Sequence, residues 1–290
     1  MTRVGGTDVI TGDTEWRIRR ETAGAPDESS LDITAAGDAL TLTVAGTGAI
    51  TVSAEGVVSW APDDAAQQRL AAIAGDWAWG QWQALHGRFA FHGAVVERDG
   101  AALVILGQPR SGASLTALSL CRRGWRLVAD GTCPVTVVDS PSRLLALPGP
   151  GTGLQVDRAV TQAFPPPEPS RDPGTPRPRS DLAVPTAGPS ELSRVVSLQV
   201  SGLQSSGVLR TGSDTDPTAG ERAWAAAAVA GEALRARNAA VRAGLDRWCR
   251  EATRLVPVEV ALVPPGEVTI FSPRQIADLI VGAPDEGGAS

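Results

Sequence analysis

Residues 101–121 decide the fold: Ala101-Ala-Leu-Val-Ile-Leu106 is followed by Gly107-Gln-Pro-Arg-Ser-Gly-Ala-Ser114 and by Leu115-Thr-Ala-Leu-Ser-Leu-Cys121. This order predicts a strand, a glycine turn and a helix, which is the setting of a phosphate-binding loop. The loop pattern G-x-x-x-x-G-K-[ST] is met except at the lysine, where Ala113 stands. The loss is not local, because all 26 basic residues of the chain are Arg. The sequence therefore predicts the frame of a nucleotide site without its main cation.

The absence of lysine can reflect a GC-rich genome or selection. A GC-rich genome would explain why Lys is absent from the whole chain, but it explains less well why the loop position holds Ala instead of Arg. Arg110, inside the loop, could supply a guanidinium to phosphate. Its backbone position differs from that of Ala113, so it would approach from another direction. The alternative for Arg110 is a solvated loop charge.

Composition excludes several classes of function. The chain has 290 residues and a formal net charge of −6, which argues against nucleic acid as the main partner. It contains no run of 18 apolar residues and no apolar stretch of a secretory signal at its start, so we expect neither a membrane span nor export. Three cysteines without C-x-x-C spacing favour a reducing cytoplasm, and two histidines nearly exclude a multi-histidine metal site.

Residues 1–85 predict a β-rich N-terminal lobe with a connecting helix. Short β-branched or alternating segments, separated by Gly or Asp, predict strands at Trp16–Arg19, Leu31–Thr34, Ala39–Val44, Ala49–Ser53 and Gly56–Trp60. A helix is expected from about Pro62, because Asp63 and Asp64 suit its first turn. Trp79, Trp82 and Leu85 predict a second helical piece.

Residues 86–290 predict an α/β core. Asp99-Gly100 between two apolar runs predicts a hairpin. Further strands are expected at Trp125–Ala129, Pro134–Val138, Arg143–Leu147, Arg194–Val200 and Val258–Val263, with a long helix over 219–251 and a last helix over Ser272–Ile280. The Pro- and Arg-rich stretch at about 163–190 predicts an exposed loop, in which Arg177 and Arg179 are either solvated or contact an acidic ligand.

Several of these segments together resemble one known family. They are Phe91-His-Gly-Ala-Val95, Val104-Ile-Leu-Gly107 with the loop, Arg122-Arg-Gly-Trp-Arg-Leu-Val-Ala-Asp130 and Leu147-Pro-Gly149. In this order they are similar to the HPr kinase/phosphorylase-like family, including its smaller bacterial relatives beside peptide natural-product pathways. The likeness covers most of the chain, is strongest at 84–150 and is loose after residue 160.

The resemblance implies a P-loop kinase core that moves the γ-phosphate of ATP to a serine hydroxyl with Mg²⁺. On that reading Gly107, Ser111, Gly112, Ala113 and Ser114 would hold the nucleotide. Backbone N–H groups of such a loop can still cradle phosphate at a helix N-terminus.

The resemblance also implies the roles of single residues. Ser114 and Asp130 match metal-binding positions, for the case that a magnesium nucleotide binds, and His92 matches the family histidine ahead of the loop strand. From the residues alone, His92 is equally a satisfied histidine at a strand start, and Asp130 is equally a turn residue before Gly131. Gly131 stands where the family has a second Asp.

These departures lead to three hypotheses. We favour a degenerate kinase fold that no longer transfers phosphate and that binds or transforms a natural-product intermediate or a peptide, with His92, Asp130 and Arg110 as candidate catalytic residues and no required cofactor. The second hypothesis is an active ATP- and Mg²⁺-dependent serine or small-molecule kinase in which Arg110 replaces the lysine. The third is a non-catalytic regulatory or partner protein. Whether the chain is an enzyme, and whether it forms a homo-oligomer, stay open.

Overall fold

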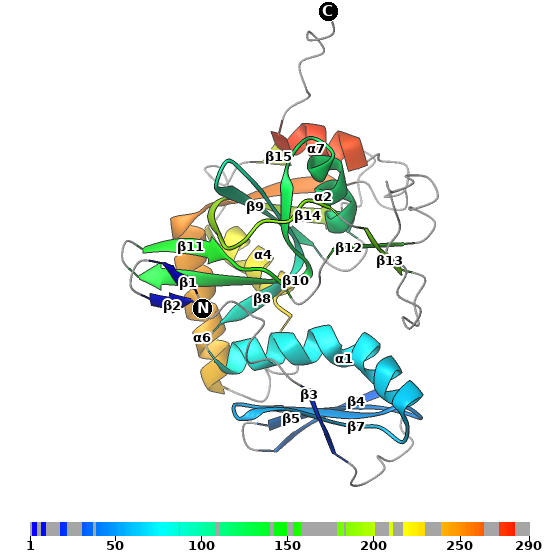
Figure 1. Ribbon diagram of the computed structural model, residues 1–290. Coiled ribbons are helices and arrows are strands. Elements are labelled where there is room, and N and C mark those ends of the chain that lie inside the picture. Colours follow the sequence, from blue (N-terminus) through cyan, green and yellow to red (C-terminus); the bar gives the residue numbers. More distant parts are fainter. Residues whose placement is uncertain are drawn as a thin grey trace, which may run out of the picture.

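Two β-sheets organise the chain, and a long helix lies between them (Figure 1). The computed structural model describes residues 2–4, 7–9, 18–21, 31–36, 39–86, 88–107, 111–139, 142–149, 153–157, 179–182, 184–200, 209–210, 217–229, 239–263 and 273–281. The fold class is α/β, with mixed sheets and helices packed on them.

The first sheet has five strands in the order β3-β7-β6-β5-β4. Its neighbours pair antiparallel except β3 and β7, which run parallel. Side chains of β5 and β6 alternate between buried and half-buried because only one face is covered. The strands are β3 (Ile18–Glu21), β4 (Leu31–Ala36), β5 (Ala39–Val44), β6 (Gly48–Ser53) and β7 (Gly56–Trp60).

The helix α1 (Asp64–Leu85) covers that face and reaches the second sheet. It begins after Asp63, whose carboxylate accepts a hydrogen bond from the backbone N–H of Ala66 at 2.7 Å. The two helical pieces expected here are one continuous helix, because Gly75 and Gly80 do not interrupt the backbone hydrogen bonds. Gly80 is needed for packing, since a Cβ there would lie 2.3 Å from a methyl group of Val229. Because α1 packs on both sheets, a domain division at residue 85 stays a prediction.

The second sheet has seven strands in the order β11-β10-β8-β9-β14-β16-β15. It closes on itself, because the start of β14 also pairs with β11 through Glu191–Leu145 and Ser190–Ala146. Its strands are β8 (Phe89–Arg98), β9 (Ala101–Gly107), β10 (Arg126–Asp139), β11 (Ser142–Ala146), β14 (Ser190–Val200), β15 (Leu209–Arg210) and β16 (Val258–Val263). The predicted hairpin is confirmed, and its turn residues Asp99 and Gly100 have φ of 57° and 85°.

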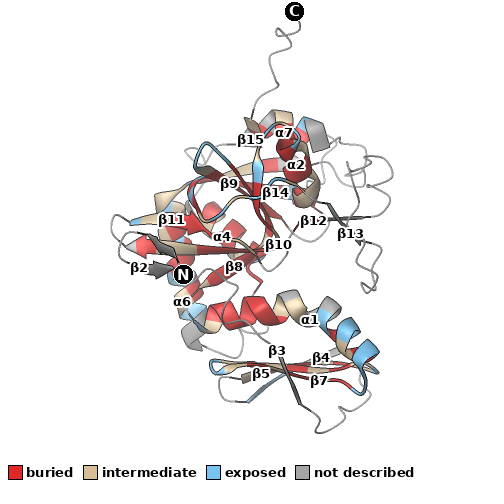
Figure 2. Cartoon of the chain, in the orientation of Figure 1, coloured by how far each residue is buried: buried red, intermediate tan, exposed pale blue. Residues whose placement is uncertain are grey.

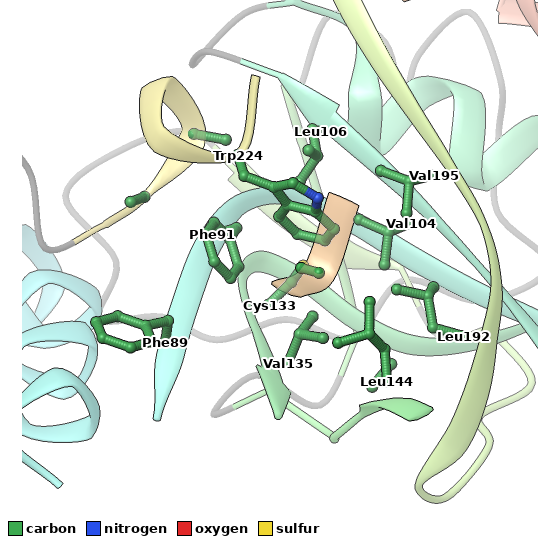
Figure 3. Close-up of a cluster of buried hydrophobic side chains, with 14 of the residues drawn as sticks. Phe89, Phe91, Val104, Leu106, Cys133, Val135, Leu144, Leu192, Val195 and Trp224 are labelled. Carbon is green, nitrogen blue, oxygen red and sulfur yellow. The ribbon is translucent and has the colours of Figure 1, made fainter. Parts of the chain in front are cut away.

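The inside of this closed ring is the main core (Figures 2 and 3). Phe91 touches Trp224 and Trp248, with ring centroids 4.6 and 4.7 Å apart, and the two indoles meet edge to face at 5.0 Å. The indoles come from α4 (Pro217–Ala227) and α6 (Ala239–Leu255). Aromatic burial of this kind is the largest apolar contribution to the fold.

The outer face of the second sheet is covered by α2 (Ala113–Cys121) and α7 (Pro273–Val281), with Ile105, Leu120 and Ile276 buried between them. An ion pair between Arg123 and Asp278 (2.6 Å) joins the two helices. Beside α2 lies the strand pair β12 (Leu154–Asp157) and β13 (Arg179–Leu182), and a further pair is β1 (Thr2–Val4) with β2 (Thr7–Val9).

Three further expectations differ from the structure. Residues 126–139 form one strand instead of two, because β10 pairs with β8 without a register shift across Gly131 and Pro134. The helix expected over 219–251 is interrupted: α4 ends at Ala227, Ala228 pairs with Phe91, and α6 begins at Ala239 after residues 230–238, which lie outside the described ranges. The loop expected at about 163–190 includes β13, whose partner β12 holds residues 179–182 in a strand, and β14 already begins at Ser190. Residues 158–178, with Arg177, lie outside the described ranges, as does Ser272, the expected helix cap. No helix within the described ranges is long and apolar enough to cross a membrane.

Candidate functional site

The candidate site lies where β9 ends and α2 begins. Gly107 is the last residue of β9, and Gly112, with φ of 93°, stands directly before α2. The strand and the helix expected from the sequence are therefore confirmed, and Gln108-Pro-Arg110 between them lies outside the described residues. No side chain caps the N-terminus of α2. Its first backbone N–H groups have no partner within the helix, so they can bind an acceptor from outside it.

The described part of the loop is tightly packed. Ser111 is 5% exposed, and a Cβ placed on Gly107 would lie 2.0 Å from its hydroxyl oxygen, so only Gly fits at position 107. Ala113 is 7% exposed, and its methyl group lies 3.8 Å from the same point. Position 113 thus holds a buried methyl group, where the loop pattern places a flexible cation.

The second wall of the site comes from β10. Asp130 accepts a hydrogen bond at 2.8 Å from the hydroxyl of Ser114, in the first turn of α2. Cys133, three residues further along β10, faces the ring interior together with its β8 partner Phe91. Because strand side chains alternate, Asp130 and Thr132 face outward, toward α2.

The register of β8 adds His92 to this face. His92 is directly opposite Thr132, and its neighbour Gly93 pairs with Leu106, the residue before Gly107. The structure therefore places His92, Asp130 and Ser114 near the end of β9, and their roles in a site stay predictions. Arg110 is the candidate whose position stays undescribed.

Two glycines opposite each other shape the sheet at this point. A Cβ on Gly93 would lie 2.2 Å from the carbonyl oxygen of Ile105. Its partner Gly131 has φ of 76°, a left-handed conformation that L-residues rarely adopt. The position where the resemblance leads one to expect a second Asp thus has a backbone that favours Gly.

The charge of Asp130 affects the electrostatics beside the site. Burial, followed by the negative charge of Asp130, raises the pKa of the Cys121 thiol to about 12. The guanidinium groups described near α2, such as Arg123, are engaged elsewhere, with Asp278. Among the described residues, no group of three His, Cys, Asp or Glu side chains is arranged to bind a metal ion.

Sequence reasoning missed Thr132. It is 1% exposed, and its hydroxyl has no hydrogen-bond partner among the described residues. A buried hydroxyl without a partner costs about 1–3 kcal/mol. The signal was available, because a residue two positions after Asp130 on a strand must share its face.

His86, the other histidine, ends α1 away from this face. Its Nδ1 lies 2.8 Å from the carbonyl oxygen of Trp82, and the two rings are tilted by 45° with their centroids 4.4 Å apart. Its role is thus in the helix end, where Arg88 also lies over the same indole.

Comparison with known proteins finds a distant structural likeness. The chain is similar to the HPr(Ser) kinase/phosphatase from Coxiella burnetii, with 15% sequence identity and a TM-score of 0.32, over 66% of this chain and 93% of that one. No family model matches the sequence. No curated protein matches it either.

Proposed function

We propose that the chain is a degenerate HPr-kinase-like protein whose site has lost ATP-dependent phosphoryl transfer and now binds or transforms a natural-product intermediate or a peptide. The proposal rests on the motif order in the sequence and on the geometry at the end of β9. Its support from fold comparison is limited to α/β character.

One observation carries the proposal: the residues at both departures from the kinase pattern fit their local packing or backbone conformation. Ala113 is buried beside Gly107, and Gly131 has a left-handed backbone. Phosphoryl transfer depends on positioning and on neutralising charge. A site that keeps Asp130 but offers no Lys is poor at holding a triphosphate, since removing one such electrostatic group costs a factor of about 10² to 10³.

The remaining groups suit a ligand of low charge. The N–H groups of α2 favour a carbonyl or carboxylate oxygen, whereas Asp130 disfavours a multiply charged anion. The hydroxyl of Thr132 offers a further donor or acceptor beside His92. A peptide or a small carbonyl compound has groups that match these donors and acceptors. His92 and Asp130 are then the acid/base candidates.

Nucleotide turnover tests the proposal. We expect no ATP hydrolysis or transfer by the purified protein with Mg²⁺. An Ala113→Lys/Gly131→Asp variant that gained turnover would support descent from a kinase, and Asp is among the residues least penalised at a left-handed φ. Robust turnover by the unmodified chain that His92→Ala abolishes would overturn the proposal in favour of the kinase hypothesis, with Arg110 as the surrogate cation.

A further inference from the structure

The helix α6 has a buried apolar face and an exposed charged face. Its apolar side chains lie in the main core, inside the closed ring: Leu245, Trp248, Cys249 and Ala252. All four of its arginines are exposed on the other side of the helix: Arg242, Arg247, Arg250 and Arg254. The helices α6 and α2 cover opposite faces of the second sheet (Figure 1), so this charged face lies away from the end of β9.

The exposed face of α6 has an excess of positive charge. The helix contains four Arg, one Asp and one Glu, which gives a net charge of +2, whereas the whole chain has −6. Arg254 pairs with Glu251 at 2.7 Å. Within the described part of the chain, Arg247 and Arg250 form no ion pair or side-chain hydrogen bond, although Asp246 lies one turn before Arg250. Their guanidinium groups can therefore donate to a group from outside the chain.

Three of these arginines form a row. Arg247, Arg250 and Arg254 are spaced by three and four residues, which places them on one side of the helix. At a rise of 1.5 Å per residue the row is about 10 Å long. Like charges at these spacings destabilise an isolated helix, so the row does not serve the folding of α6. Trp248, whose ring centroid lies 4.7 Å from that of Phe91, anchors the helix in the core and so keeps the row in place.

A short acidic segment matches this row better than other anionic partners do. The fork of a guanidinium donates two parallel hydrogen bonds to one carboxylate. A DNA duplex or an anionic membrane is an extended negative surface, so it would also face the rest of a chain with net charge −6 and be repelled. Pairing with α6 of a second copy would place like charges opposite each other, which is unfavourable.

We propose that the exposed face of α6 is a docking site for a short, Asp- or Glu-rich segment of a partner protein. Carboxylates of the segment pair with Arg247 and Arg250, and Arg254 adds positive charge at the end of the row. The row lies on the other side of the second sheet from His92 and Asp130, so the proposal does not depend on the proposed function of that site.

A labelled acidic peptide tests the proposal directly. The probe is an end-blocked, fluorescein-labelled octapeptide of alternating Glu and Ala, and its anisotropy is followed during titration with the full chain. We expect binding that weakens at least ten-fold between 50 and 500 mM salt, since exposed charges are screened. The matched Gln-Ala peptide should not bind. Tighter binding of the chain to a DNA duplex or to phosphatidylserine vesicles than to the Glu-Ala peptide would overturn the proposal.

Three double variants locate the contact. Arg247→Glu/Arg250→Glu reverses two exposed charges of the row and should weaken binding at least ten-fold. Arg247→Lys/Arg250→Lys keeps the charge and should weaken binding less than five-fold, which separates a charge effect from damage to the helix. Arg69→Glu/Arg98→Glu makes the same change in net charge as the first variant at two exposed positions outside α6 and should weaken binding less than three-fold. Equal loss in the two Glu variants, or no binding of the Glu-Ala peptide at low salt, would overturn the proposal.

Discussion

The two sheets use the same strand chemistry in opposite ways. The five-stranded sheet is packed on one face by α1, so the Thr and Ser side chains of β5 and β6 point away from the core as expected. Ser59 of β7 is buried on the covered face, where it accepts a hydrogen bond from Gln67 of α1. The seven-stranded sheet is buried on both faces, by α4 and α6 on one side and by α2 and α7 on the other. Polar side chains in the second sheet therefore need a structural or functional explanation, and those at the end of β9 form the candidate site.

The largest expected effect contrasts two tryptophans. Trp224→Ala empties the ring interior and should lower the free energy of unfolding by about 4 kcal/mol, as for other buried aromatic deletions. Trp60→Ala, on the half-buried outer face of the first sheet, should cost about 1 kcal/mol. Urea unfolding measures both, and equal losses would mean that the two sheets are not packed differently.

The next effect contrasts two strand glycines. Gly93→Ala should cost about 3 kcal/mol, because its Cβ would meet the Ile105 carbonyl oxygen at 2.2 Å in a packed sheet. Gly56→Ala, with φ of 150° but nothing within 4 Å, should cost about 1 kcal/mol. Thermal unfolding of both variants gives the comparison. A smaller loss at Gly93 than at Gly56 would contradict the close approach of β8 and β9.

Two threonines should respond with opposite signs. Thr132→Val removes a buried hydroxyl without a partner and should stabilise the fold by about 1 kcal/mol. Thr51→Val removes a hydroxyl that shares a 2.8 Å hydrogen bond with Thr41 and should destabilise it by about 1 kcal/mol. If Thr132→Val is instead destabilising in chemical denaturation, its hydroxyl has a partner in the folded protein.

The smallest effect at neutral pH concerns Cys121. Its folded-state pKa of about 12 lies above the usual value of 9.0 because of burial and Asp130. The unfolded chain therefore releases this proton first, so stability is unaffected below about pH 9 and falls as pH rises toward 12, by about 1.4 kcal/mol per pH unit at most. The slope of stability against pH should differ between wild type and Cys121→Ala only in that window. A steeper pH dependence in the variant would contradict the assignment.

Local patterns predicted local structure well. The strand and helix on either side of the loop and the Asp99-Gly100 hairpin follow from residues close in sequence. Position 131 shows the limit, since Asp130-Gly131 indicates a turn between two strands, while pairing with β8 carries β10 across it. The pairing of β11 with β14 joins segments 45 residues apart and could not be foreseen, and Thr132 was missed because its lack of a partner depends on packing from several elements.

Calorimetric titration with ATP and Mg²⁺ tests the central claim most directly. The account predicts no binding heat at millimolar ATP, because the loop offers a buried methyl group at position 113, where the loop pattern places a lysine. Ser114→Ala, which removes the hydroxyl bound to Asp130, should then leave the result unchanged. Micromolar binding to the wild type that is lost in Gly112→Asp would contradict the account and would show that the loop still holds phosphate.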